Sequence, residues 1–329
     1  MDFRIIYYMA KKYAIGIDIG GTNTKLGVVA ADAQVLFRDR FNTPDYKTFD
    51  SYVKMLAMRI RGLMEQSEGE CVGIGIGAPN GNYYKGTIDN APNLPFGAGE
   101  FPLVANLREE FGLKHIYMTN DANAAALGEK IYGGAKDLEH FITITLGTGL
   151  GSGIIIDGKL LYGADGAAGE LGHTCAIPNG RLCNCGNRGC LETYASATGI
   201  KRTFFELMAE YNGNSLLKDK SWDEIDAFEI EKAAKAGDKI ARETYRKTGE
   251  ILGKSLADFV AFSRPQSIFL FGGPVKSGEL LLAPARKALD ENLYPIWRGK
   301  IKIVPSHLPE SDAAIMGSSS LVWAELAEI

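Results

Sequence analysis

Residues 13–30 read YAIGIDIGGTNTKLGVVA, and this stretch decides the fold. Its apolar residues form two strand-like runs on either side of Gly20-Gly21-Thr22-Asn23, a sequence typical of a tight turn. Residues 141–156 repeat the plan around Gly147-Thr148-Gly149. A strand, glycine turn, strand pattern that occurs twice indicates two similar α/β domains with a cleft between them.

The rest of the chain alternates strand and helix patterns. Strands are expected at 35–41, 72–76, 116–119, 267–271 and 301–304, and helices at 53–64, 103–111, 199–211, 227–262, 276–290 and from about 312. Residues 82–100 are rich in Gly, Pro and Asn, which predicts irregular structure. We therefore expect a first domain at 13–120, rejoined by a C-terminal helix at about 312–329, and a larger second domain at 121–311.

Composition sets bounds on the function. The chain has 329 residues, of which 46% are hydrophobic and 23% charged, an ordinary balance for a globular protein with two cores. The net charge of -4 argues against a nucleic-acid-binding surface, which is usually basic. No apolar run reaches membrane-spanning length, and residues 1–10 lack the features of a signal peptide. We therefore expect a cytoplasmic protein with no membrane partner, in which residues 1–8 are an extension outside the fold.

Three glycine turns follow predicted strands: Gly20-Gly21-Thr22, Gly147-Thr148-Gly149 and Gly272-Gly273. Such turns expose backbone N–H groups that can cradle phosphate oxygens, although each alone is also typical of an ordinary hairpin. Asp18 could hold Mg²⁺ through water, and Thr22 or Lys25 could meet a phosphate. The first two turns lead into strands rather than helices, which argues against a Rossmann dinucleotide site.

Asp121 directly follows a predicted strand and begins a predicted helix. Helix capping is the commoner role for an Asp in this position. A sugar hydroxyl is a poor nucleophile, however, and phosphoryl transfer uses a carboxylate to orient it and to accept its proton. The neighbouring phosphate-type turns therefore favour Asp121 as a catalytic base.

One imidazole and three thiols have the spacing of a tetrahedral zinc site: His173, Cys183, Cys185 and Cys190. Glycines between the cysteines permit the tight turn that such a site needs. Four protein ligands leave no open position, so the predicted zinc is structural. Cys175 could compete as a ligand, and free thiols or a disulfide are the alternative.

Two carboxylates flank the predicted zinc site. Glu170 lies three residues before His173, and Glu192 lies two residues after the last cysteine. Carboxylates and amides held at fixed positions suit a polyol, because each can accept a hydrogen bond from a hydroxyl. Asn93 and Asn120 could join them in such a site, and the alternative is a set of solvated loop residues.

Taken in order, these segments resemble the ROK family of bacterial sugar kinases and repressors. The matching segments are Asp18-Ile-Gly-Gly-Thr-Asn-Thr-Lys25, Asn90-Ala-Pro-Asn-Leu94, Asn120-Asp-Ala-Asn-Ala124, Leu146-Gly-Thr-Gly-Leu-Gly-Ser-Gly153, Ala168-Gly-Glu-Leu-Gly-His173 and Cys183-Asn-Cys-Gly-Asn-Arg-Gly-Cys-Leu-Glu192. The run 189–199 looks especially like the glucokinases of the family. The family's aromatic residue after Asn-Leu is here Pro95-Phe96, a small departure in the expected sugar pocket.

The resemblance implies a two-domain, actin-like ATPase fold (ribonuclease H-like), a homodimer or higher homo-oligomer, and transfer of the ATP γ-phosphate to a hexose. It implies Asp121 as the base, the four zinc ligands above, and a hexose bound by Asn93, Asn120, Asp121, Glu170, His173 and Glu192. D-glucose is the expected substrate. The alternatives are N-acetylmannosamine, N-acetylglucosamine or fructose, and a sugar-sensing regulator without catalysis. About a dozen residues precede the first predicted strand, fewer than the helix-turn-helix of the family's repressors requires.

Overall fold

The structure is a computed structural model that describes residues 12–309 and 311–327. The chain forms two compact units. Unit 1 contains the described residues up to Asp137, Leu160–Ala168 and those from His307 onward; unit 2 contains Leu138–Lys159 and Gly169–Ser306. The division therefore differs from the predicted boundary after residue 120. The physical reason is helix packing in unit 1, where a Cβ on Gly128 would lie only 3.0 Å from the Cα of Gly317 in the last helix.

Unit 1 is built on a five-stranded sheet in the order β3-β2-β1-β4-β8, in which β1, β4 and β8 run parallel. Its elements are β1 (Lys12–Ile19), β2 (Asn23–Ala30), β3 (Val35–Asn42), η2 (Thr43–Asp45), α1 (Phe49–Gln66), β4 (Glu70–Gly77), β5 (Gly81–Asn82), β6 (Thr87–Asp89), β7 (Glu100–Phe101), α2 (Leu103–Phe111), β8 (Ile116–Thr119), α3 (Asp121–Ile131) and α9 (Ala313–Ala327). The predicted irregular region thus contains a small antiparallel sheet of β5, β6 and β7.

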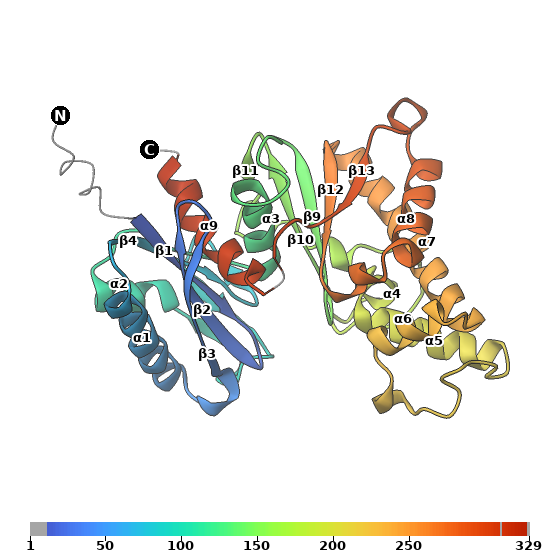
Figure 1. The fold of residues 1–329 in the computed structure, drawn as a ribbon, viewed down its shortest axis with the longest axis horizontal. Helices are drawn as coiled ribbons and strands as arrows, with labels where there is room; N and C mark the ends of the chain where they lie inside the picture. Colours follow the sequence, from blue (N-terminus) through green and yellow to red (C-terminus); the bar gives the residue numbers. More distant parts are fainter. Residues whose placement is uncertain (1–11, 310, 328–329) are drawn as a thin grey trace. The chain divides into compact units, whose positions relative to one another are not determined.

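The two faces of the unit 1 sheet carry different residues, as period-two alternation requires. Isoleucines of β1 and β4 pack in one hydrophobic core with Tyr52 and Leu56 of α1. The other face carries glycines, and a Cβ on Gly16 or Gly75 would overlap the backbone of α9. Glycine therefore lets α9 lie directly against β1 and β4, and Figure 1 shows α1 and α9 on opposite sides of these strands.

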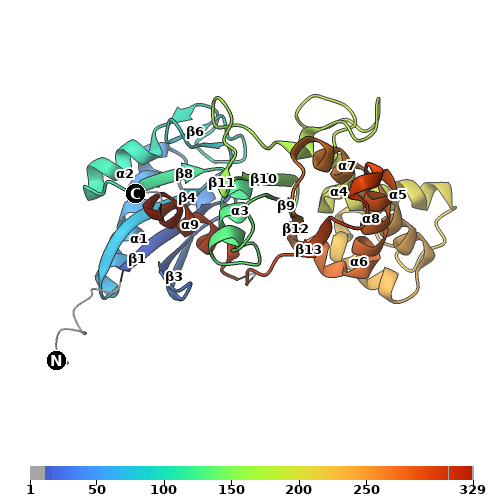
Figure 2. The same ribbon diagram turned by 90° about the horizontal axis from the view of Figure 1, so that it is seen from above.

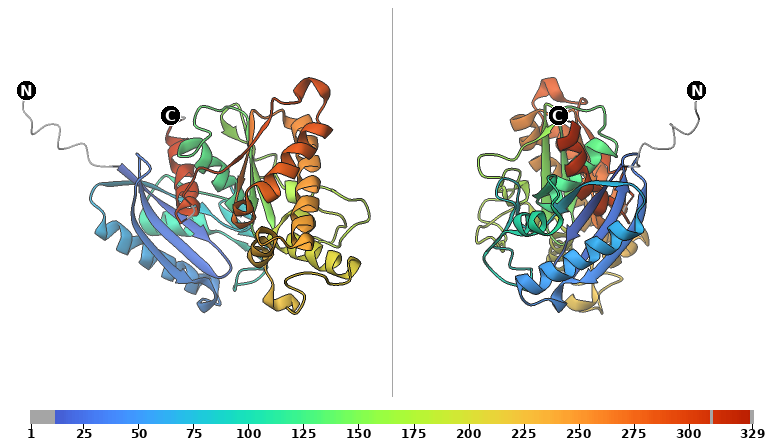
Figure 3. Two further views of the ribbon diagram at one scale, coloured as in Figure 1. Left: turned by 45° about the vertical axis from the view of Figure 1, so that its right-hand side comes forward. Right: turned by 90° about the vertical axis from the view of Figure 1, so that its left-hand side faces the viewer.

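Unit 2 is built on a five-stranded sheet in the order β11-β10-β9-β12-β13, in which β9, β12 and β13 run parallel. Its elements are β9 (Phe141–Leu146), β10 (Leu150–Ile156), β11 (Lys159–Leu160), η3 (Leu171–His173), α4 (Glu192–Ala195), α5 (Ala197–Glu210), η4 (Trp222–Glu224), α6 (Ala227–Lys235), α7 (Lys239–Ser263), β12 (Ser267–Phe271), η5 (Gly273–Ser277), α8 (Glu279–Asn292), η6 (Pro295–Trp297) and β13 (Lys302–Pro305). Helices α7 and α8 run side by side along this unit (Figure 3).

The helix predicted at 227–262 is in fact two helices. The first helix, α6, ends at Lys235. Gly237 follows it with a φ of +100°, a left-handed conformation that glycine adopts readily and that does not continue a helix. Asp238 then caps α7, because its side chain accepts a hydrogen bond from the backbone N–H of Ala241 at 3.0 Å. Among the described residues, no helix is both long enough and apolar enough to cross a membrane.

Candidate active site

The parallel strands of unit 1 bring three sequence motifs to one edge of the sheet. In the strand register Asp18 of β1 lies beside Gly77 of β4, and Gly77 lies beside Thr119 of β8. Asp121 comes two residues after Thr119, and its Cα would lie 3.6 Å from a Cβ on Gly77. The carboxyl ends of parallel strands are where open α/β sheets bind ligands. Asp18 and Asp121 therefore occupy the edge at which a ligand is expected.

Asp18 is held in an unfavourable environment for a charge. Burial raises its pKa from 3.8 to about 6, the Lys25 ammonium opposes this shift, and the negative charge of Asp121 adds to it. Lys25 lies directly across the hairpin from Asp18 in the antiparallel register of β1 and β2. A carboxylate of this kind favours a bound cation, because the cation would offset the cost of its buried charge.

Asn120, rather than Asp121, caps helix α3. The Asn120 Oδ1 accepts a hydrogen bond from the backbone N–H of Asn123 at 2.8 Å, and the helix begins at Asp121. The predicted alternative role for Asp121, a plain cap, is therefore taken by its neighbour. The Asp121 side chain faces solvent and accepts a 2.8 Å hydrogen bond from the Ala122 N–H. Desolvation by the surrounding chain nevertheless raises the pKa of Asp121, while that hydrogen bond lowers it.

Asn93 lies beside the first glycine turn. A Cβ on Gly21 would lie 2.8 Å from the Asn93 carbonyl oxygen, so only glycine permits this approach. Gly20 closes the turn by donating its N–H to the Asn23 carbonyl at 3.0 Å. Unit 1 thus places four of its predicted site segments together: the turn with Gly20, Gly21 and Thr22, the Asp18–Lys25 pair, Asn93, and Asn120 with Asp121.

Unit 2 places its two glycine turns next to each other. Gly272 has a φ of +113°, and a Cβ there would overlap the backbone of Leu146, the residue before Gly147. A Cβ on Gly147 or Gly273 would meet no atom within 4 Å, so the backbone at both turns is open. Gly147 and Thr148 are exposed. The predicted phosphate turns 147–149 and 272–273 therefore form one open edge at the ends of β9 and β12.

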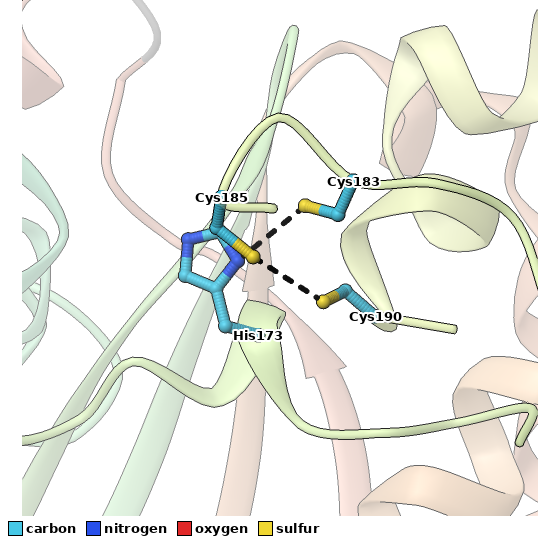
Figure 4. A group of neighbouring side chains, drawn as sticks. All are labelled: His173, Cys183, Cys185 and Cys190. Carbon is cyan, nitrogen blue, oxygen red and sulfur yellow. Dashed lines mark hydrogen bonds between the residues drawn. The ribbon is translucent and has the colours of Figure 1, made fainter. Parts of the chain in front are cut away.

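The four predicted metal ligands lie close together: His173 is in η3, and the three cysteines are in the loop between η3 and α4 (Figure 4). One donor atom from each of His173, Cys183, Cys185 and Cys190 lies within 4.8 Å of all the others. The Nδ1 of His173 lies 3.7 Å from the Cys183 Sγ, and the sulfurs of Cys185 and Cys190 are 3.6 Å apart. A backbone hydrogen bond from Asn187 lowers the pKa of Cys185. Three thiols and an imidazole at these separations fit Zn²⁺, whereas Cys175 is outside this group of four.

Glu192 connects this cysteine loop to a glycine turn. Its Oε2 accepts a hydrogen bond from the backbone N–H of Leu150 at 3.0 Å, immediately after the turn 147–149. Its Oε1 lies 3.8 Å from the Cys183 Sγ. Glu170 is exposed and directly precedes η3, which carries His173. Unit 2 thus groups Glu192 with the predicted metal ligands and with one of the phosphate turns.

The sequence analysis missed Arg181, which organises the cysteine loop from within. Its side chain is only 8% exposed and forms an ion pair with Glu206. The guanidinium donates to the Thr193 carbonyl at 2.6 Å and to the Thr203 Oγ1 at 2.9 Å, and it lies 4.4 Å from the ring centre of Tyr194. An arginine in a polar loop usually lies in solvent, so the pattern alone gave no sign of this burial.

The chain is similar to known proteins over nearly its whole length. Residues 14–325 match the ROK family. A glucokinase from Thermotoga maritima is 35% identical over 317 residues, which cover 95% of this chain and 98% of that protein. A xylose repressor from Caldicellulosiruptor bescii is 31% identical over 95% of this chain and 78% of the repressor.

Among solved structures, a ROK family glucokinase from Streptomyces griseus, crystallised in complex with glucose and AMPPNP, superposes with a TM-score of 0.77. It is 34% identical, and the match covers 94% of this chain and 98% of that one. The predicted family and fold are confirmed. This chain belongs to the ROK family and has its actin-like ATPase fold.

Proposed function

We propose that this protein is an ATP-dependent glucokinase, which transfers the γ-phosphate of ATP to the 6-hydroxyl of D-glucose and forms glucose 6-phosphate. The observation that carries the proposal is the position of Asp121. Its carboxylate lies at the carboxyl end of the unit 1 sheet, and Asn120 performs the capping role in its place. The glucokinase relatives at 34–35% identity over nearly the whole chain support the same activity.

In this mechanism Asp121 orients the sugar hydroxyl and accepts its proton as the oxygen attacks the γ-phosphorus. A raised pKa suits this role, because a stronger base holds the transferred proton better. We assign the remaining hydroxyls to the polar side chains of Asn93, Asn120, Glu170, His173 and Glu192. Because the Nδ1 of His173 faces Cys183, we assign its Nε2 to the sugar.

The ATP phosphates are assigned to the glycine turns and their neighbours: Gly20, Gly21, Thr22 and Lys25 of unit 1, and Gly147, Thr148, Gly149, Gly272 and Gly273 of unit 2. Backbone N–H groups of open turns suit phosphate oxygens. Asp18 is the residue that we expect to hold Mg²⁺, whose chemistry is to neutralise charge on the phosphates. Lys25 lies opposite Asp18 and would contact a phosphate.

A structural Zn²⁺ bound by His173, Cys183, Cys185 and Cys190 would fix the loop that carries Glu170 and Glu192. Outer residues of such loops orient the ligands and the groups beside them. Arg181 performs a related task from inside the loop, where it holds the backbone of Thr193 next to Glu192. We further propose a cytoplasmic, homo-oligomeric enzyme that feeds carbohydrate metabolism and glycolysis. These last proposals rest on the family resemblance.

The test compares kcat/KM for glucose, mannose, fructose, N-acetylglucosamine and N-acetylmannosamine with ATP and Mg²⁺ at one fixed concentration. We expect glucose to have the highest value. A higher value for either acetamido sugar would replace the glucokinase assignment by an acetamido-sugar kinase, and a higher value for fructose by a fructokinase.

The xylose repressor at 31% identity keeps a second candidate open, a regulator that binds sugar without phosphorylating it. Calorimetry with glucose and with xylose, together with the turnover assay, separates the two. Sugar binding with no ADP formation for any of the five sugars would favour the regulator.

A further inference from the structure

A short segment, Leu160–Ala168, belongs to unit 1 although the chain on both sides of it belongs to unit 2. We call this segment the strap. It begins at Leu160, the second residue of the edge strand β11, and it ends two residues before Glu170. The contacts that hold the strap therefore act directly on the stretch of chain that leads to Glu170 and His173.

Two tyrosines of unit 1 form a platform for the strap. The ring of Tyr162 stacks on the ring of Tyr83, with a centroid separation of 3.9 Å and an interplanar angle of 14°. Tyr84 meets Tyr162 edge to face at 6.0 Å, and its hydroxyl donates a 3.0 Å hydrogen bond to the Gly163 carbonyl. Figure 2 shows the residues directly after β11, which belong to unit 1, beside the small sheet that contains β6, the strand that follows this tyrosine pair in the sequence.

Asn82 adds a polar anchor to the same platform. Its Nδ2 donates to the carbonyl of Asp165 at 3.0 Å, while its Oδ1 accepts from the N–H groups of Tyr84 and Lys85 at 3.1 Å each. Gly166 is buried against this amide, and a Cβ there would lie 3.1 Å from the Asn82 Oδ1. The amide is thus oriented by its own turn before it binds the strap.

The platform is itself fixed to the core elements of unit 1. The hydroxyl of Tyr83 hydrogen-bonds to the Glu325 carboxylate on α9, and its ring lies nearly parallel to that of Tyr117 on β8. Because α9 packs on the central strands of the sheet, the tyrosine platform is tied to a rigid part of the unit.

The chain is fixed again immediately after the strap. The hydroxyl of Ser152, a buried residue of β10, hydrogen-bonds to the Gly169 carbonyl and accepts from the Leu171 N–H at 3.2 Å. Ser152 therefore holds the chain on both sides of Glu170, at Gly169 and at Leu171. The tyrosine platform holds the strap, which ends at Ala168, so only Gly169 separates the strap from Glu170 and release of the strap acts on Glu170 through this one residue.

We propose that Tyr83, Tyr84 and Tyr162 are positioning residues for hexose binding, which act by setting the place of Glu170 and His173. This inference rests on the proposed function, in which both residues bind the sugar. Stacked aromatic pairs and single hydrogen bonds make modest contributions, so the expected loss of glucose affinity is about three- to tenfold. ATP binding and the chemical step should be unaffected.

The experiment compares the full-length wild type with two variants. Tyr162→Leu removes the stacked ring, and Tyr162→Phe keeps it. Glucose Kd is measured by calorimetry, KM for glucose and for ATP and kcat by a coupled assay, and zinc by elemental analysis. We expect Tyr162→Leu to raise the Kd and KM for glucose about three- to tenfold. Tyr162→Phe should restore both, and KM for ATP, kcat and zinc content should stay within about twofold of wild type.

Equal glucose affinity in wild type and Tyr162→Leu would overturn the positioning role, as would a parallel rise in KM for ATP or a loss that Tyr162→Phe does not restore. Because Kd is measured without turnover, the comparison holds even if wild type forms no ADP, a result that would overturn the proposed function alone. If Tyr162→Leu does not fold, Tyr84→Phe decides. It removes only the hydroxyl that binds Gly163, and we expect glucose Kd to rise about twofold; no rise would contradict the inference.

Discussion

The glycine turn of unit 1 and the glycine turn of unit 2 share one plan. Each joins two antiparallel strands, β1 to β2 and β9 to β10, and in each the first strand pairs in parallel with a neighbour, β4 or β12. The edges that they form differ in chemistry. The unit 1 edge carries two carboxylates with raised pKa values, Asp18 and Asp121, whereas the unit 2 edge carries a loop of cysteines and one histidine.

The two edges are also held in place by different means. In unit 1 a helix packs on glycine-bearing strands, so regular secondary structure alone fixes Asp18 and Asp121. In unit 2 the residues between η3 and α4 have little regular structure, and the cysteine cluster and the side chain of Arg181 lie among them. Under the proposed function, unit 1 supplies the catalytic carboxylates and unit 2 positions sugar-binding residues, so substitutions in the two units should fail in different ways.

The largest effect is expected from Asp121→Asn in unit 1. This change keeps the size of the side chain and removes the base, so kcat should fall by about 10²–10⁴ while glucose Kd changes little. Steady-state kinetics and calorimetry measure the two quantities. Asp137→Asn, an exposed carboxylate of the same unit, is the matched control and should behave as wild type. Near-normal turnover of Asp121→Asn would exclude it as the base.

Asp18→Asn should lose activity and gain stability, a combination that only a strained functional carboxylate predicts. We expect kcat/KM to fall by about 10²-fold through weakened Mg²⁺ binding, because a neutral amide is a poorer ligand for a hard cation. The free energy of unfolding of the metal-free protein should rise by roughly 1–3 kcal/mol at pH 7–8, since one pKa unit corresponds to about 1.4 kcal/mol. Thermal denaturation measures the second effect.

The pH dependence of the stability that Asp18→Asn gains over wild type follows from the raised pKa of Asp18. Between pH 3.8 and about 6 the folded chain binds this proton more tightly than the unfolded chain does. The free energy of unfolding of wild type therefore decreases as the pH rises through this range, and the loss persists above it. Asp18→Asn lacks this titration, so its advantage should be present above pH 6 and vanish near pH 4. An advantage that grows toward acid pH would contradict the assignment.

Removing a metal ligand of unit 2 should impair binding rather than chemistry. Cys185→Ser should abolish binding of the one zinc per chain that we propose for wild type and raise the KM for glucose about tenfold or more, because Glu170, His173 and Glu192 lose their common support. Elemental analysis and kinetics are the measurements. Cys175→Ser, an exposed cysteine outside the ligand group, is the matched control and should keep its zinc. Wild type without zinc but with normal glucose affinity would refute the metal assignment.

The sequence predicted the elements whose signals are local. The strands around both glycine turns, the C-terminal helix and the cysteine spacing were all readable, because periodicity, glycine and ligand spacing act over a few residues. It did not predict that Asn120 caps α3, since Asn and Asp are both good caps and only the backbone shows which one performs the role.

Contacts between distant segments were also beyond the sequence. Nothing near Tyr83 indicates that its ring stacks on Tyr162, 79 residues later, or that Arg181 is buried. The unit boundary after Asp137 depends on α9 returning to α3, which is tertiary packing rather than pattern.

The smallest effect, and the sharpest test of the division between units, concerns Glu192. This residue belongs to the unit 2 loop, yet it binds the N–H of Leu150 beside a phosphate turn, so it could serve the sugar, the turn or both. Glu192→Gln keeps an acceptor for that N–H and removes the charge, whereas Glu192→Ala removes both.

If Glu192 acts only on the sugar, both variants should raise the KM for glucose and leave the KM for ATP unchanged. If it also holds the turn, Glu192→Ala should raise the KM for ATP about three- to tenfold, which corresponds to the loss of one hydrogen bond to a charged group, and Glu192→Gln should restore most of it. We expect the second result, because the carboxylate lies so close to the turn that a Cβ on Gly149 would be only 2.3 Å from its Oε2.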